Sequence, residues 1–380
     1  MNFLFVAPVK DNNAVNAGYG NASNSFAYIL KKLKKEGVIK ELVIVNTNSL
    51  SDNDVQYCLS KQFDISLTIC HPSSFHNPKV LRIFQTLLST SKHRLLNILW
   101  ETTPLPTAWD FLWKTDLFTG FTAPSDFLFN LVKEKTDKKV FKCPYFVNTH
   151  QYPRVLKENK KEEDVFNVLF VGQSTKRKGV EDAIIAFSRS LGHYLDCRLN
   201  LKVHHLSPHD LNIEQLIPFL VKTNCHSFKG QIHLCQDNLS NKQIIELYKE
   251  SSLLLFCSRG EGFGLPAVEA SSMGIPVLYT NGSSLSEVAE GNGNMPINCY
   301  TDSSVGMVHH GYEINSLYTI PSIMHMEHLL LEKYKLWLED RNKYYEEPSQ
   351  NYKIIDEKYG EESIKKYFNS IFETLQEKKE

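Results

Sequence analysis

The stretch that decides the fold reads Gly260-Glu261-Gly262-Phe263-Gly264-Leu265-Pro266-Ala267-Val268-Glu269-Ala270-Ser271-Ser272-Met273-Gly274-Ile275-Pro276-Val277. Its first three glycines follow a continuous apolar run at residues 253–257 and precede a segment with helical character. Pro266 suits the first turn of that helix, where its missing N–H leaves no hydrogen bond unmade. A glycine-rich turn from strand to helix presents backbone N–H groups and the positive end of the helix dipole, which together bind a phosphate or an oxyanion.

Two carboxylates flank this turn: Glu261 lies in the predicted loop, and Glu269 lies inside the predicted helix. Carboxylates repel a phosphate, but they hold pairs of hydroxyl groups through charge-assisted hydrogen bonds. A phosphate-binding turn beside two hydroxyl-binding carboxylates describes the recognition of a nucleotide sugar.

Outward from this stretch, apolar runs alternate with segments of helical period, which is the pattern of parallel α/β sheets. Strands are predicted at residues 2–7, 41–45, 65–70, 95–99 and 118–123 in the first half, and at 167–171, 198–203, 231–234, 253–257 and 276–279 in the second. Helices lie between them, and from Met326 onward the chain is helical and charged. One apolar stripe on the last helix, formed by Ile364, Phe368, Ile371 and Leu375, predicts that this helix packs on a domain.

With 380 residues, the chain has the length of two domains of ordinary size. Its composition, 42% hydrophobic and 22% charged, excludes collagen-like and largely disordered proteins. No apolar run approaches the ~20 residues of a membrane-spanning helix, so no transmembrane segment is predicted. The charged stretch at 152–164 has the composition of a linker. We therefore expect a first domain at residues 1–152, a second at 165–340, and C-terminal helices at 341–380 that pack back on the first.

The cysteines and the charges bear on location and partners. None of the eight cysteines forms a Cys-x-x-Cys pair, so we interpret them as reduced thiols of a cytoplasmic protein that is soluble, or peripheral at a membrane or on DNA in an infected host cell. Residues 1–150 carry a net charge of +5 and the remainder −6. The basic half suits an anionic partner or ordinary solvation. No metal is predicted, because Asp52-Asn53-Asp54 stands in a Ser/Asn-rich stretch expected to be a loop, and the histidines at 204, 205 and 209 lack a cysteine or carboxylate arrangement suited to zinc.

The whole string 260–277 closely resembles the Glu-x7-Glu signature of retaining glycosyltransferases of the glycogen synthase/sucrose synthase-like group, which adopt the GT-B fold. The resemblance implies two doubly wound, Rossmann-like α/β domains facing a central cleft, with the C-terminal helix returning to the first domain. It also implies a nucleoside-diphosphate sugar, expected to be a UDP-sugar, as donor substrate, and no further cofactor. In such an enzyme Glu269 holds the ribose hydroxyls and Glu261 those of the sugar. The donor diphosphate is contacted by the turn, at Gly262, Phe263, Gly264 and Leu265.

Residues 168–180 resemble the strand, loop and helix with which this family brings basic residues to the donor diphosphate. Many members have an arginine directly after the strand's glycine, and here that place holds Gln173. Arg177 and Lys178 therefore take the role in our prediction, with the question open which of them faces the phosphates. Arg259, just before the signature, is either another donor contact or a surface residue.

In the first half, Ala17-Gly18-Tyr19-Gly20-Asn21 resembles the family's glycine-rich loop, so Gly18 and Gly20 are expected in a long loop that approaches the donor. Residues 99–109 resemble a Trp-Glu-Thr segment of a subset of these enzymes, in which Glu101 stands where other members often have a histidine near the transferred sugar. Glu101 is thus a catalytic candidate, with a helix cap as the alternative. His71, at the end of the predicted strand 65–70, is a second candidate for the acceptor side or a structural residue.

The resemblance implies a retaining hexosyl- or pentosyltransferase whose acceptor is a hydroxyl group of a glycan or glycolipid. Two alternatives stay open. A phage-type DNA glycosyltransferase modifying 5-hydroxymethylcytosine in duplex DNA would make use of the basic first half. An inactive, lectin-like sugar-binding protein would keep the site without turnover.

Overall fold

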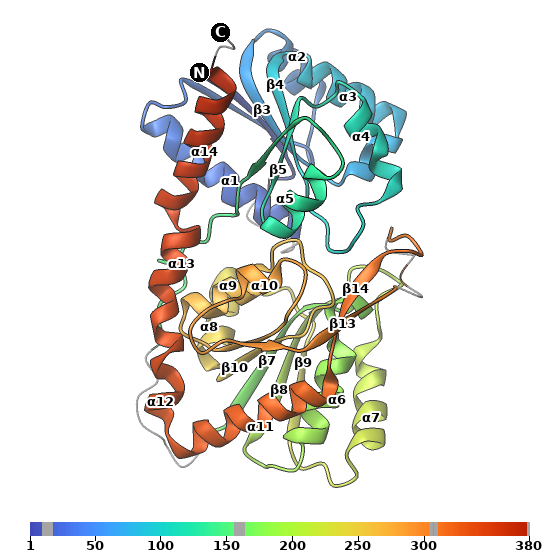
Figure 1. Cartoon of the computed structure of the whole chain (residues 1–380), viewed down its shortest axis with the longest axis vertical. Coiled ribbons are helices and arrows are strands. Elements are labelled where there is room, and N and C mark those ends of the chain that lie inside the picture. Colours follow the sequence, from blue (N-terminus) through green and yellow to red (C-terminus); the bar gives the residue numbers. More distant parts are fainter. Residues whose placement is uncertain (10–17, 156–163, 304–306, 308–310, 378–380) are drawn as a thin grey trace. The chain divides into compact units, whose positions relative to one another are not determined.

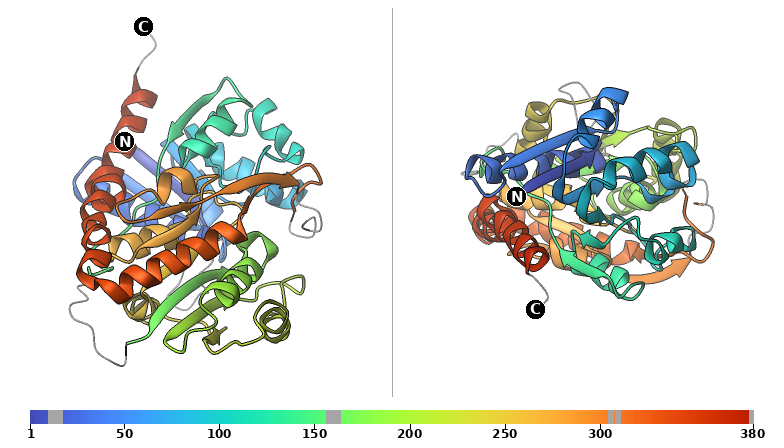
Figure 2. Two further views of the ribbon diagram at one scale, coloured as in Figure 1. Left: turned by 60° about the horizontal axis from the view of Figure 1, so that its bottom comes forward. Right: turned by 90° about the horizontal axis from the view of Figure 1, so that it is seen from above.

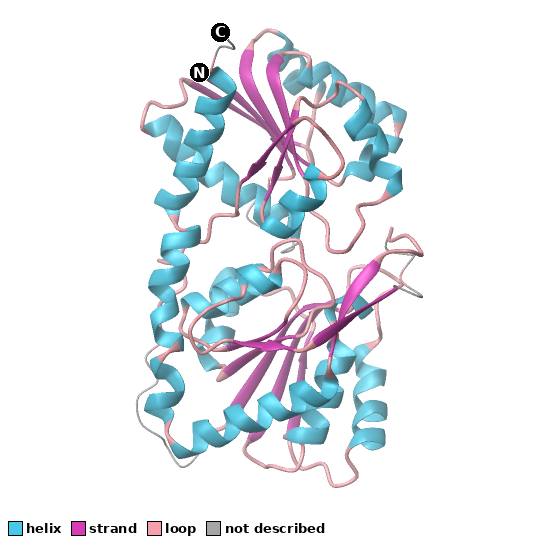
Figure 3. Ribbon diagram, viewed as in Figure 1, coloured by secondary structure: helices cyan, strands magenta, loops and turns pink. Residues whose placement is uncertain are grey.

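The computed structural model describes residues 1–9, 18–155, 164–303, 307 and 311–377 (Figure 1). The chain divides into two compact units. Unit 1 consists of Met1–Trp100, Leu105–Val147 and Lys358–Glu380, and unit 2 of Glu101–Pro104 and Asn148–Glu357. Each unit contains a parallel six-stranded sheet with helices packed around it (Figure 3).

Unit 1 is built on a sheet with the strand order β2-β1-β3-β4-β5-β6. Its strands are β1 (Asn2–Ala7), β2 (Glu41–Asn46), β3 (Phe63–Ile69), β4 (Ser91–Asn97), β5 (Gly120–Ala123) and β6 (Lys139–Lys142). Its helices are α1 (Gly18–Lys35), α2 (Asp52–Leu59), α3 (Pro78–Leu88), α4 (Asp110–Lys114), α5 (Asp126–Lys133) and α14 (Glu361–Gln376), with two 3-10 turns, η1 (Pro72–His76) and η2 (Thr107–Trp109). The central strands are apolar on both faces because helices cover both faces of a parallel sheet.

Unit 2 repeats this architecture with the strand order β12-β11-β10-β7-β8-β9. Its strands are β7 (Phe166–Gln173), β8 (Cys197–His204), β9 (Gln231–Cys235), β10 (Leu253–Phe256), β11 (Val277–Thr280) and β12 (Met295–Ile297). Its helices are α6 (Val180–Ser190), α7 (Ile213–Asn224), α8 (Asn241–Glu250), α9 (Leu265–Ser272), α10 (Leu285–Val288), α11 (Ile323–Glu339) and α12 (Arg341–Glu346), with the 3-10 turns η3 (Lys176–Lys178) and η5 (Pro348–Gln350). Helix α13 (Asn351–Tyr359) runs from unit 2 into unit 1 along the sequence. One hydrophobic cluster joins the sheet to α6 and α11, and another joins it to α8 and α9.

An antiparallel hairpin of β13 (Cys299–Ser303) and β14 (Leu317–Pro321) is added to unit 2. It extends beyond the parallel sheet as an orange arm in Figures 1 and 2. The sequence analysis predicted neither this hairpin nor the short strands β6 and β12. Each has no more than five residues and lacks a continuous apolar run.

Two local predictions from the sequence are wrong. The segment Gly18–Asn21 is not a loop but the first turn of α1, and Ala17 lies outside the described residues. Asp52-Asn53-Asp54 is likewise helical: Ser51 caps α2, and Ser51 and Asp54 form a reciprocal capping box. In both places residues that are common in loops stand at a helix start, where the first N–H groups need no partner within the helix.

The order of the strands places a topological switch point in each sheet. In unit 1 the chain runs from β1 outward to β2 and then returns to β3 on the other side of β1. In unit 2 it runs from β7 outward through β8 and β9 and returns to β10 on the other side of β7. Ligands of open α/β sheets bind outside the carboxyl ends of the strands at such points. The edges next to β1 and β3 and next to β7 and β10 are therefore where a site is expected.

Helix α14, the last of the chain, packs on unit 1 as its apolar stripe predicts. Phe368 lies edge-on to Phe26 of α1, with ring centroids 5.3 Å apart, and Phe372 lies 5.6 Å from Phe3 of β1. Of the C-terminal segment expected at 341–380, residues up to Glu357 group with unit 2, and those from Lys358 group with unit 1. No helix within the described ranges has the length and apolarity needed to cross a bilayer.

Replacing Phe368 with alanine should destabilise unit 1 by about 3–5 kcal/mol, because the side chain is 1% exposed and its removal leaves a cavity among aromatic rings. Denaturant unfolding followed by circular dichroism measures the loss. Lys366→Ala, at an exposed position of the same helix, is the matched control and should change the free energy of unfolding by less than about 0.5 kcal/mol. Equal effects of the two substitutions would contradict the packing of α14 on unit 1.

Candidate active site

The switch point of unit 2 collects the charged residues predicted from the sequence. Strands β7 and β10 are parallel neighbours, with Leu253 opposite Val168 and Leu254 opposite Leu169. The loops that follow them therefore leave the same edge of the sheet. The loop after β7 carries Arg177 and Lys178 in η3, and the loop after β10 carries Glu261.

In the space between these loops, two cations meet one carboxylate. Lys178 Nζ donates a hydrogen bond to Glu261 Oε1, and Arg177 Nη1 lies 3.7 Å from the same oxygen. Arg177 Nη1 also donates to the carbonyl oxygen of Gly260 at 2.7 Å. The side chains of Arg177, Lys178 and Glu261 are 11%, 15% and 9% exposed. The predicted phosphate-binding cations thus lie almost entirely out of water.

Burial and charge act against one another in this cluster. Burial by itself raises the pKa of Glu261, but Lys178 and Arg177 outweigh it and hold that pKa below its usual value. Burial lowers the pKa of Lys178 below its ordinary value, although Glu261 opposes the shift. Burial also acts to lower the pKa of Arg177, but acidic neighbours, first Tyr312 and then Glu101, raise it above its ordinary value. Glu261 and Arg177 are therefore charged at neutral pH.

A second carboxylate reaches Arg177 from the segment 101–104, which groups with unit 2. Glu101 Oε1 lies 3.5 Å from Arg177 Nη2, and Tyr312 donates its hydroxyl hydrogen to Glu101 Oε2 at 3.0 Å. Thr103 pairs with Leu317 of β14 through two backbone hydrogen bonds, of 2.6 and 3.3 Å. The hairpin therefore holds the segment that carries Glu101, and the four residues predicted as catalytic, Glu101, Arg177, Lys178 and Glu261, come together in unit 2.

The glycines of the signature are needed for two close approaches. A Cβ at Gly260 would overlap the carbonyl oxygen of Glu101. Gly264 has φ +98°, in the left-handed region, and a Cβ there would lie 2.5 Å from Leu285 Cδ2. Helix α9 begins directly afterwards, at Leu265. Ser284 fixes the turn at residues 261–263, because its hydroxyl group donates to the carbonyl oxygens of Glu261 and Phe263, at 2.7 and 3.0 Å.

Glu269, the second glutamate of the signature, is held by two tyrosines. Tyr152 donates its hydroxyl hydrogen to Glu269 Oε1 at 2.7 Å, and Tyr248 donates to Oε2 at 2.9 Å. Burial first, and then the charge of Glu269, raises the pKa of both tyrosines above the ordinary value. The tyrosines therefore stay protonated and fix the orientation of the carboxylate.

Arg259 has a carboxylate partner of its own. Its Nε and Nη2 both donate to Asp182 Oδ2, at 3.0 and 2.7 Å, and Asp182 belongs to the first turn of α6. The pair ties the loop after β10 to α6. Gln173, which stands where many members of the family have an arginine, donates to both carboxylate oxygens of Asp210 at 3.1 Å.

The residues predicted in the first half lie at the switch point of unit 1. Gly18 and Gly20 open α1, and the ring of Tyr19 between them lies edge-on to His71, with centroids 6.1 Å apart. His71 follows β3, and its Nδ1 accepts the backbone N–H of Ser73 at 3.3 Å as the cap of η1. His71 also contacts Trp109 edge-on, at 5.6 Å. The structure thus brings Gly18, Gly20 and His71 to one edge of the unit 1 sheet, whereas Glu101 groups with unit 2.

Several residues of the site were not predicted from the sequence. Tyr312 and Ser284 stand in segments without a motif, and Tyr152 stands in the stretch expected to be a linker. Tyr248 lies in a predicted helix, where a tyrosine is expected to be an ordinary core residue. Only the partners that these side chains reach in the fold identify them. Within the described residues, no group of three or more His, Cys, Asp and Glu side chains is arranged to hold a metal ion.

Replacing Tyr312 with phenylalanine should lower the free energy of unfolding of unit 2 by about 1 kcal/mol, because Glu101 loses a hydrogen bond to a hydroxyl that is almost fully buried. Denaturant unfolding measures the change. Tyr300→Phe, on the exposed face of the same hairpin, is the matched control and should leave stability unchanged. A Tyr312→Phe protein as stable as the control would mean that the hydroxyl does not hold Glu101.

Comparison with known proteins gives a family match to the segment that contains Arg177, Lys178, Glu261 and Glu269. Residues 153–295 match the model of the family "Glycosyl transferases group 1". The chain is 33% identical to an uncharacterized 41.2 kDa protein in the cps region of Klebsiella pneumoniae over 138 residues. This match covers 34% of this chain and 32% of that protein. The chain is also 29% identical to the serotype-specific mannosyltransferase WbdA of Escherichia coli over 123 residues. This match covers 32% of this chain and 14% of WbdA. The chain thus spans about a third or less of the length of these curated relatives.

The fold is shared over the whole chain. The structure of sucrose-phosphate synthase from Thermosynechococcus elongatus superposes with a TM-score of 0.67 and 12% identity, and it covers 99% of both chains. At this identity the likeness concerns the fold. The chain therefore has the GT-B fold, and its residues 153–295 match the model of the glycosyl transferases group 1 family.

Proposed function

We propose that this chain is a retaining glycosyltransferase that moves a hexosyl or pentosyl group from a nucleoside-diphosphate sugar to a hydroxyl group of a glycan or glycolipid. The observation that carries the proposal is the buried cluster of Arg177, Lys178, Glu261 and Glu101 at the β7/β10 switch point. Arg177, Lys178 and Glu261 belong to the segment that matches the group 1 family, and α9 begins four residues after Glu261.

The cluster is electrically balanced, with two cations against two carboxylates. We expect a diphosphate that enters beside the start of α9 to replace Glu261 as the partner of Lys178 and to pair with the outer edge of Arg177. The reason is that its oxygens together carry more charge than one carboxylate. Arg177 keeps its bond to the carbonyl of Gly260 and so stays oriented. Glu261, released from Lys178, then turns to the hydroxyl groups of the sugar. Arg177 and Lys178 already lie beside the turn, so they are positioned to stabilise the charge that develops when the diphosphate leaves.

Glu269 is assigned to the ribose. Tyr152 and Tyr248 donate to its two oxygens and so fix the orientation of the carboxylate, and a carboxylate can hold the paired hydroxyls of a ribose by charge-assisted hydrogen bonds. Arg259 is assigned to bracing the loop against α6, because both of its donated bonds go to Asp182.

The chemical step uses Glu261 as a binding group. Before a donor binds, Lys178 and Arg177 outweigh burial and hold the pKa of Glu261 below its usual value, and with the donor bound we assign this carboxylate to the hydroxyl groups of the sugar and not to attack on it. The bond between the anomeric carbon and the diphosphate oxygen breaks, and the acceptor oxygen forms the new bond on the same face. The departing diphosphate oxygen takes the acceptor's proton. Because the new bond forms on the face that the diphosphate leaves, the configuration of the sugar is retained.

The function is tested by measuring release of nucleoside diphosphate from UDP-, GDP- and ADP-sugars, with mannose donors included because WbdA is named a mannosyltransferase. One donor should support turnover, and neutral glycans should increase it. Glu261→Gln should lower kcat/KM by roughly 10²–10³, the scale for one charged contact made in the transition state. Glu290→Gln, at an exposed position, is the control and should match the native protein.

Other results of the same measurement would favour one of the two alternative functions. Stimulation by hydroxymethylcytosine-containing DNA, with steep loss of activity as salt rises, would identify DNA as the acceptor. No release from any donor, with the native protein and Glu261→Gln alike, would leave a sugar-binding protein without turnover.

Glu269→Ala should cost about 2–4 kcal/mol in transition-state binding, the scale of charged hydrogen bonds to two ribose hydroxyls. The measurement is kcat/KM for the donor identified above, with Glu269→Gln as the variant that keeps the shape and part of the hydrogen bonding. Near-normal turnover of the alanine variant would end the assignment of Glu269 to the ribose.

A further inference from the structure

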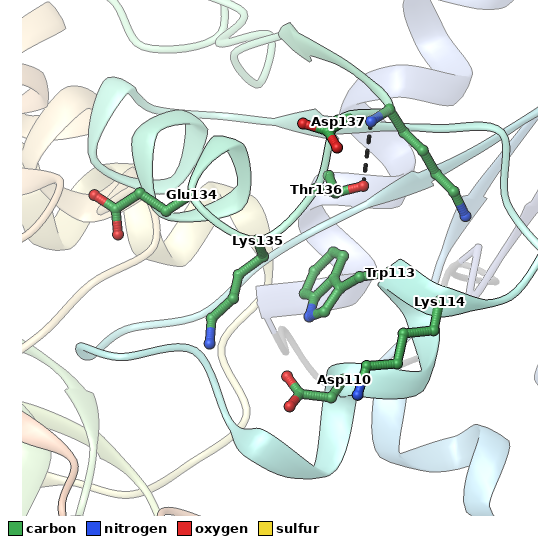
Figure 4. A pocket seen from close by; sticks show the side chains of 8 residues that line it. Asp110, Trp113, Lys114, Glu134, Lys135, Thr136 and Asp137 are labelled. Carbon is green, nitrogen blue, oxygen red and sulfur yellow. Dashed lines mark hydrogen bonds between the residues drawn. The ribbon is translucent and has the colours of Figure 1, made fainter.

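A pocket of about 480 Å³ lies in unit 1, away from the residues discussed above (Figure 4). One side is formed by α4 and the other by the turn that follows α5. Lys138 directly precedes β6, so this turn lies at the amino end of that strand, whereas His71 follows the carboxyl end of β3. The pocket is therefore not part of the switch point of unit 1. Its lining consists of Asp110, Trp113, Lys114, Glu134, Lys135, Thr136, Asp137 and Lys138.

The indole of Trp113 gives this pocket a buried donor. The Trp113 ring packs in a T-shaped contact with Phe121 of β5, with ring centroids 4.9 Å apart, and Trp113 is 9% exposed. Its Nε1 is buried and has no hydrogen-bond acceptor among the described residues. In Figure 4 the nitrogen edge of the ring faces the part of the pocket where Asp110 and Lys135 lie. A buried N–H without an acceptor is costly, and a ligand oxygen in the pocket would satisfy it.

The remaining polar groups carry both signs of charge. Lys138 is committed to the structure, because its ammonium group donates to the carbonyl oxygens of Thr115 and Phe118, the latter at 3.0 Å. Asp110, Lys114 and Lys135 make no ion pair or side-chain hydrogen bond within the part of the chain that the structure describes. The pocket thus offers acceptors on its carboxylates and donors on two ammonium groups and one indole.

This combination selects the ligand class. A phosphate or another polyanion would meet the carboxylates of Asp110, Glu134 and Asp137. A hydroxyl group both donates and accepts, so one polyol can use the carboxylates, the ammonium groups and the indole N–H together. The volume is in the range of pockets that hold small organic ligands.

We propose that this pocket binds a neutral sugar residue of a glycan through Trp113, Asp110 and Lys135. Its link to an acceptor glycan rests on the proposed function, but the binding itself does not. A second sugar site on unit 1 would raise the local concentration of a glycan chain around the enzyme.

The test is isothermal titration of the full chain with three neutral trisaccharides: mannotriose, maltotriose and cellotriose. At least one should bind saturably and shift the tryptophan fluorescence. Trp113→Phe, which keeps a ring but removes the N–H, and Asp110→Asn should each weaken that binding by at least about fivefold, as expected for the loss of one hydrogen bond. Asp116→Asn makes the same charge change outside the pocket and is the matched control. Its affinity should equal that of the native chain.

Binding that Trp113→Phe and Asp110→Asn both leave unchanged would place the sugar elsewhere and overturn the proposal, as would the absence of saturable binding for all three sugars. Inorganic phosphate binding that Asp110→Asn strengthens would assign the pocket to anions instead. Thermal unfolding checks that Trp113→Phe is folded, and Asp110→Asn carries the test if it is not. Release of nucleoside diphosphate without an acceptor should be the same in all variants. A chain that binds the trisaccharide in this pocket but releases no diphosphate would retain this site and lose the proposed function.

Discussion

The pairing of β7 with β10 is the constraint on which the candidate site depends. These strands are far apart in the sequence, and their parallel register brings the loop of Arg177 and Lys178 beside the loop of Glu261 at one edge of the sheet. A shift of one residue in this register would turn every side chain of the strand to the other face and separate the loops. The register is held by the two hydrophobic clusters on either side of the sheet, so the geometry of the site follows from the burial of the core.

Charge compensation is the second condition for the site. Removing a guanidinium and an ammonium group from water costs free energy unless opposite charges accompany them. Glu261 compensates Lys178, and Glu101 lies within ion-pair distance of Arg177. The β13–β14 hairpin takes part through Tyr312 and through the pairing of Thr103 with Leu317. The hairpin is an addition to the parallel sheet, with no motif in its sequence, and it supports the buried charged cluster of unit 2.

Tyrosines have a parallel role at Glu269. Tyr152 comes from the segment that enters unit 2, and Tyr248 from α8, yet both reach the same carboxylate. Val155 continues the contact by donating its backbone N–H to the carbonyl of Met273 at 2.9 Å. The entry of the chain into unit 2 is thus fastened to the end of α9, and the residue assigned to the ribose is oriented by the same segment.

The comparison of sequence and structure shows which signals are local. The ten predicted strands of the two sheets are present because apolar runs of this length in an α/β chain are buried as strands of a parallel sheet. Strands β6 and β12 and the hairpin were not predicted, because they are short and mostly polar or half-exposed. Gly18 and Gly20 were expected in a loop, and the structure starts α1 there because a helix start tolerates residues that its interior does not. Arg259 was a candidate for the donor, and its partner in the fold is Asp182, 77 positions away.

The sequence by itself determined the fold class, the strand-to-helix turn with its glycines, and the two carboxylates around that turn, because these depend on residue order and spacing within a few turns of chain. Only the tertiary structure decided that Glu101 joins Arg177, that Tyr312, Tyr152 and Tyr248 fix the carboxylates, and that Trp113 faces a pocket with charges of both signs. The physical reason is that these contacts join segments distant in the sequence. Hydrogen bonds and ion pairs between such segments depend on distances that strand order and packing set, and residue order along the chain does not contain them.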